Sequence, residues 1–65
     1  GMVNDEGELR TAVEAIIASN PSSVADYRGG KDKALGFLVG QTMKEMKGKA
    51  DPSIINQLLK ELLKG

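Results

Sequence analysis

Several residue types that carry chemistry in small proteins are missing from this 65-residue chain. Without cysteine it has no disulfide and no thiolate metal site, as is usual in a reducing cytosol. Without histidine it lacks the commonest general base and the commonest metal ligand. No apolar run approaches the roughly 18 residues that a membrane-spanning helix needs. We therefore expect a cytoplasmic protein with no membrane contact, no metal site, no cofactor and no catalytic residues of its own.

The length limits the chain to a single domain with one core. A domain of this size buries only about 60% of the surface that its unfolded chain exposes, so its stability depends on good local helix signals. Gly1 and Met2 are typical of a scar left by a protease ahead of a start codon. We interpret residues 1–8 as this scar and a disordered linker, and residues 9–65 as the folded domain, expected to be monomeric.

The net charge of zero hides an uneven distribution along the chain. Residues 1–27 hold one basic and five acidic residues, whereas residues 28–49 hold six basic and two acidic ones. The local net charges are therefore −4 and +4, so overall neutrality says little about partners. The positive segment is either a solvated helix surface or a contact surface for an anionic partner.

Apolar residues recur with the period of helices, and no segment alternates as a strand does. Helices are predicted over residues 9–19, 21–28, 31–47 and from Pro52 onward. The expected fold is all-α: a small bundle of about four helices, with two longer amphipathic helices, one short helix and one terminal helix. The terminal helix carries the broadest apolar stripe, and that stripe must be covered.

Asn20-Pro21 and Asp51-Pro52 each predict a helix start, because Asn and Asp are preferred N-caps and proline suits the first helical position. Gly29-Gly30 and Gly48 predict helix ends, since glycine readily adopts the left-handed cap conformation.

The helix predicted over residues 31–47 separates into two faces at about 100° per residue. Its core side is apolar except for one threonine and comprises Leu35, Leu38, Val39, Thr42, Met43 and Met46. Its other side is basic and comprises Lys33, Gly36, Phe37, Gly40, Lys44 and Lys47. Each glycine there costs about 1 kcal/mol relative to alanine, so the pair needs a reason.

Two interpretations of the basic side remain open from the pattern alone. In the structural one, Gly36 and Gly40 let another helix of the domain cross closely, with Phe37 packed beside it. In the functional one, the side contacts a phosphate backbone. Its lysines, with Lys49 beyond the helix, would neutralise phosphates, and Gln41 at its edge would form hydrogen bonds.

A family resemblance adds to this pattern. The Asn20-Pro21 start, "VADYRGGKDKALGFLVGQ" at residues 24–41, Met43-Lys44 and "GKADP" at residues 48–52 resemble the C-terminal tail domain of the GatB/YqeY family. That family includes the B subunit of the aspartyl/glutamyl-tRNA amidotransferase. The resemblance covers residues 20–63, and residues 1–8 carry no part of it.

The resemblance implies a tRNA-binding domain that is not catalytic by itself. The parent enzyme of the family converts Glu-tRNA(Gln) and Asp-tRNA(Asn) to Gln-tRNA(Gln) and Asn-tRNA(Asn), using ATP, magnesium and glutamine. Its catalytic sites lie in the body of the B subunit and in the A subunit, and a C subunit completes the complex. The tail domain contacts the outer corner of tRNA near the D-loop.

With this resemblance, the residues assigned to tRNA binding are Lys33, Gly40, Gln41, Lys44, Lys47 and Lys49, whereas Gly36 and Phe37 are assigned mostly to packing. The alternative is a protein-interaction or structural module of a stand-alone YqeY-like protein. Such a module would dock a partner through the apolar face of the terminal helix or through the basic side.

Overall fold

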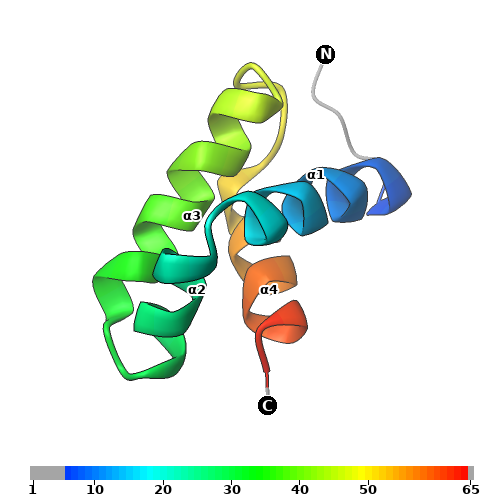
Figure 1. The fold of residues 1–65 in the computed structure, drawn as a ribbon. Coiled ribbons are helices and arrows are strands. Elements are labelled where there is room, and N and C mark those ends of the chain that lie inside the picture. Colours follow the sequence, from blue (N-terminus) through cyan, green and yellow to red (C-terminus); the bar gives the residue numbers. More distant parts are fainter. Residues whose placement is uncertain (1–5, 65) are drawn as a thin grey trace.

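The computed structural model describes residues 6–64, which form four helices in a small bundle (Figure 1). They are α1 (Glu6–Ser19), α2 (Pro21–Arg28), α3 (Asp32–Glu45) and α4 (Pro52–Leu62). The predicted all-α fold and the order of its helices are confirmed. Helices α1 and α3 each contact the other three helices, and α2 and α4 pack more extensively on α3 than on α1.

The core lies where one side of α3 meets α1, α2 and α4. Its fully buried large side chains are Leu9, Val13, Leu38, Thr42, Ile55 and Leu59. Thr42 is the polar member of this set, and its hydroxyl donates a 2.8 Å hydrogen bond to the backbone carbonyl of Leu38. A buried hydroxyl without a partner would be costly, so this bond lets Thr42 take a core position.

Helix α1 begins at Glu6, three residues before its predicted start at Leu9. Glu6, Gly7 and Glu8, expected in the linker, are therefore helical. Two acidic side chains in a first turn interact favourably with the positive end of the helix dipole, which offsets the weak helix propensity of Gly7. The rest of the predicted linker, residues 1–5, lies outside the described residues.

The two Asx-Pro helix starts differ in the structure. At Asp51 the carboxylate accepts a 2.8 Å hydrogen bond from the backbone N–H of Ser53, which confirms the predicted N-cap. Asn20 forms no such bond with α2. Asn20 occupies the predicted N-cap position of α2, but its side-chain amide instead donates a 2.8 Å hydrogen bond to the carbonyl of Ile16. Asn20 stabilises the end of α1 because α2 follows without an intervening loop.

Both α2 and α3 end in the same hydrogen-bonded turn, the Schellman motif. After α2, Lys31 N–H donates to the Asp26 carbonyl and Gly30 N–H to the Tyr27 carbonyl, with Gly30 at φ +102°. After α3, Gly48 N–H donates to the Met43 carbonyl and Lys47 N–H to the Lys44 carbonyl.

The left-handed position of the second turn is occupied by Lys47, at φ +55°, where glycine is usual. Gly48 follows at φ +72°. The predicted end of α3 at about Lys47 is therefore two residues late: the helix ends at Glu45, and Lys47 lies in the turn that the Gly48 N–H closes onto the Met43 carbonyl. A side chain in this conformation costs roughly 1–2 kcal/mol.

Replacing Lys47 with glycine is expected to raise the free energy of unfolding by roughly 0.5–1 kcal/mol, because glycine adopts a positive φ without steric cost. Urea denaturation followed by circular dichroism measures the change. Lys47→Ala is the matched control, since it removes the same charge but keeps a β-carbon. An equal gain in both variants would assign the effect to the charge and not to the backbone.

Candidate functional site

One side of α3 is left uncovered by the other helices. Five exposed residues lie along it at helical spacing: Lys33, Gly36, Phe37, Gly40 and Lys44. We call this set the basic stripe. Lys33 and Lys44 are about 16 Å apart along the helix axis, at 1.5 Å per residue. The predicted separation of α3 into a core side and a basic side is confirmed, since Leu38 and Thr42 are fully buried on the core side.

The other residues assigned to tRNA binding lie beside the basic stripe. Gln41 is half-buried in α3. Lys47 and Lys49 are exposed in the turn between α3 and α4, so Lys47 is not on the helical face where the pattern placed it. Because the backbone of Lys47 is left-handed, the direction of its side chain does not follow the helical periodicity of α3. The structure therefore brings three of the six residues, Lys33, Gly40 and Lys44, onto one exposed side.

The glycines of the basic stripe have no packing role within the described residues. Apart from adjacent residues and the nearby backbone of α3 itself, a β-carbon built at Gly36 or at Gly40 would meet no atom within 4 Å. No helix of residues 6–64 crosses α3 closely at these positions, and the structural interpretation of the pair is wrong. Neither glycine has a positive φ, so backbone geometry does not require it either.

Phe37 is likewise not packed into the core. Its exposed fraction is 47%, and it is the exposed large hydrophobic residue of the described chain. The assignment of Phe37 to packing is therefore wrong. Periodicity already placed Phe37 on the basic side, but the pattern alone could not tell whether another helix covered it.

The lysines of the basic stripe have no carboxylate partner among residues 6–64. The ion pair found there joins Arg10 and Glu14 at 3.7 Å, between exposed side chains of α1. The nearest acidic residues in sequence, Asp32 and Glu45, are exposed on α3 and form no ion pair within the described range. The charges of Lys33 and Lys44 are therefore open to an external anion.

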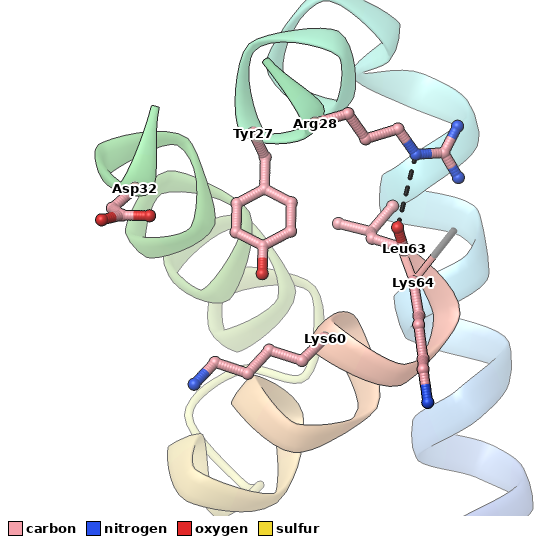
Figure 2. Close-up of a pocket in the computed structure, with 6 residues that line it drawn as sticks. All are labelled: Tyr27, Arg28, Asp32, Lys60, Leu63 and Lys64. Atoms are coloured by element: carbon pink, nitrogen blue, oxygen red, sulfur yellow. Dashed lines mark hydrogen bonds between the residues drawn. The ribbon is translucent and has the colours of Figure 1, made fainter. Parts of the chain in front are cut away.

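A second feature, which the sequence did not indicate, is an open pocket of about 470 Å³ at the opposite end of α3 from its last turn. Figure 2 shows its lining residues: Tyr27, Arg28, Asp32, Lys60, Leu63 and Lys64. Arg28 Nε donates a 3.4 Å hydrogen bond to the Leu63 carbonyl, which links α2 to the end of α4. The side chains of Lys60 and Lys64 extend in different directions (Figure 2), so their amines do not converge on one point.

Within residues 6–64, no group of three or more acidic, histidine or cysteine side chains could hold a metal ion. None of the helices in the same range has the length and apolar character required to cross a bilayer.

The sequence profile described as "GatB domain" matches residues 1–63. The chain belongs to the GatB domain family. The match extends to residue 1, so it is longer than the resemblance carried by residues 20–63 and includes residues 1–8, to which that resemblance did not extend.

Curated relatives of this GatB domain agree with the profile. The chain is 68% identical over 62 residues to the B subunit of the aspartyl/glutamyl-tRNA(Asn/Gln) amidotransferase of Lachnospira eligens, and these residues cover 95% of the chain and 13% of the relative. It is 62% identical to the protein of the same name from Lachnoclostridium phytofermentans, over 97% of the chain and 13% of the relative. The chain thus spans about 13% of the length of these relatives. No solved structure matches.

Because the space around both glycines is open, Gly36→Ala and Gly40→Ala are each expected to stabilise the free domain by roughly 0.5–1 kcal/mol. Thermal denaturation of the two variants measures this gain. Gly30→Ala is the matched control and should destabilise the domain by about 1 kcal/mol or more, since it forces a β-carbon into φ +102°. A loss of stability in Gly40→Ala would contradict the absence of a packing role.

Proposed function

We propose that this domain is the tRNA-binding tail of an amidotransferase B subunit and is not catalytic by itself. The observation that carries the proposal is the basic stripe of α3, whose glycines and lysines have no function within the described fold. The names of the curated relatives support an enzyme that acts on Glu-tRNA(Gln) and Asp-tRNA(Asn).

The chemistry of the basic stripe suits contact with a folded RNA. Lys33 and Lys44 supply positive charge that is not neutralised among the described residues. Between them, Gly40 leaves the helix surface bare, so a sugar-phosphate backbone can approach the helix closely. Such contacts recognise shape and charge, because the base edges of A-form RNA are poorly accessible. We assign the contact to the outer corner of tRNA near the D-loop, with Gln41, Lys47 and Lys49 at its margin.

A small interface of this kind is sufficient when it is tethered. The parent enzyme would supply the catalytic sites, the ATP and magnesium, and the A and C subunits. Attached to that body, the domain would meet its tRNA at an effective concentration of up to about millimolar, so a few phosphate contacts are enough.

The alternative of docking a protein through the terminal helix finds no support in the structure. The apolar face of α4 is covered by the domain itself, since Ile55 and Leu59 are fully buried and Leu58 nearly so. Docking of a protein partner through the basic stripe is the other alternative, and the RNA-binding experiments distinguish it from tRNA binding.

Neutralising Lys33 or Lys44 is expected to weaken tRNA binding and its salt dependence together. With four phosphate contacts, log K should fall with log salt at a slope of roughly −3, and each Lys→Gln change should make that slope shallower by about 0.7–0.9. Fluorescence anisotropy with labelled tRNA at several salt concentrations measures both quantities. Lys60→Gln, an exposed lysine of α4 outside the basic stripe, is the control.

In the parent enzyme, the same substitutions should raise KM for tRNA and leave kcat unchanged, because the domain contributes binding and no chemistry. An unchanged KM, with unchanged salt dependence, would overturn the proposal.

Gly40→Ala is expected to weaken tRNA binding severalfold although it stabilises the fold, because its methyl group occupies the surface that the RNA backbone approaches. Anisotropy titrations of the folded variant measure the loss. Gly36→Ala is compared in the same titration, since both glycines have equally open surroundings in the free domain. Unchanged binding in Gly40→Ala would remove Gly40 from the interface.

A further inference from the structure

Phe37 is the part of the basic stripe that phosphate contacts do not explain. An aromatic ring offers nothing to a phosphate, yet this ring lies on the same exposed side of α3 as Lys33 and Lys44. With 47% of its surface exposed, Phe37 contributes less to the core than any buried residue of α3. Its position therefore favours contact with something outside the domain.

The residues around Phe37 on the helix leave room for a flat ligand. Gly36 precedes it and Gly40 follows one turn later, so two of the positions next to Phe37 on this side of the helix carry no side chain. Lys33 lies one turn before it, about 6 Å along the axis, and Lys44 about 10 Å after it. An apolar ring is thus bordered by bare backbone and lies between two cations that have no partner among residues 6–64.

We propose that Phe37 stacks on an unpaired base of the RNA while Lys33 and Lys44 hold the adjoining phosphates. The inference rests on the proposed function and adds to it the class of RNA recognised. Aromatic side chains stack on the face of any base, and single-stranded loops are where such faces are accessible. Phenylalanine has no hydrogen-bonding group, so the contact selects an unpaired base without selecting its identity.

The charge around the ring favours RNA over a protein partner. The buried core of a protein interface is depleted of charged residues, lysine among them. Phe37 instead lies between lysines on the most basic segment of the chain, residues 28–49. Base stacking combined with backbone neutralisation is the usual chemistry of single-strand recognition.

The experiment uses the 65-residue chain with two probes: tRNA, and a blunt RNA duplex without unpaired bases. Phe37→Leu keeps an apolar side chain but removes the ring. It should weaken tRNA binding roughly five- to a hundred-fold, leave duplex binding unchanged, and leave the salt slope unchanged because no charge is altered. Circular dichroism checks that the variant remains folded, as expected for a substitution at an exposed position.

A second variant reports stacking directly. The chain contains no tryptophan, so Phe37→Trp introduces a single indole at the site. This variant should retain tRNA affinity, and its fluorescence should be quenched by tRNA and not by the duplex.

The possible outcomes separate the inference from the proposed function. If Phe37→Leu binds tRNA normally while Lys44→Gln does not, stacking is overturned and the proposed function stands; a Phe37 that docks a protein would give this result. Equal losses for tRNA and duplex in Phe37→Leu would also overturn stacking on an unpaired base. If the unaltered chain does not bind tRNA at low salt even at millimolar concentration, the proposed function fails, and the inference fails with it.

Discussion

The burial of one side of α3 against the three other helices is the constraint on which the domain depends. Leu38 and Thr42 are fully buried there, and the core residues of α1, α2 and α4 gather around them. A chain of 65 residues has apolar side chains for one such core and no further described helix to cover the second side of α3. The exposed side can therefore carry residues chosen for contact with another molecule.

Most of the fold could be predicted because its signals are local. Helical periodicity and the Asx-Pro and Gly-Gly pairs locate all four helices and the turn at Gly30. The errors arise where two elements compete for one group. Asn20 can cap the start of α2 or close the end of α1, and only the geometry of the α1–α2 junction selects the bond to Ile16. Likewise, Gly48 was expected to end α3, but hydrogen bonding places Lys47 at the left-handed position.

The candidate site was less predictable than the helices that carry it. A helical projection separates the basic side of α3 from its core side, and burial confirms that separation. The projection cannot tell whether a second helix lies over Gly36 and Phe37, because packing partners are distant in the sequence. The open space at both glycines answers that question. The pocket beside Arg28 was not predictable from the sequence, because its walls come from residues that are distant in the chain. The hydrogen bond from Arg28 to the Leu63 carbonyl, for example, spans 35 positions.

The open space at Gly36 and Gly40 also distinguishes selection for folding from selection for binding. At Gly30, a positive φ ties the residue to folding, so any sequence that keeps this turn has a reason to keep glycine. At Gly36 and Gly40, folding would accept alanine, and selection for stability alone would favour replacing both glycines. Their retention across the evolution of a lineage would therefore measure selection for an assembled state, in which a second molecule occupies the space that the free domain leaves empty.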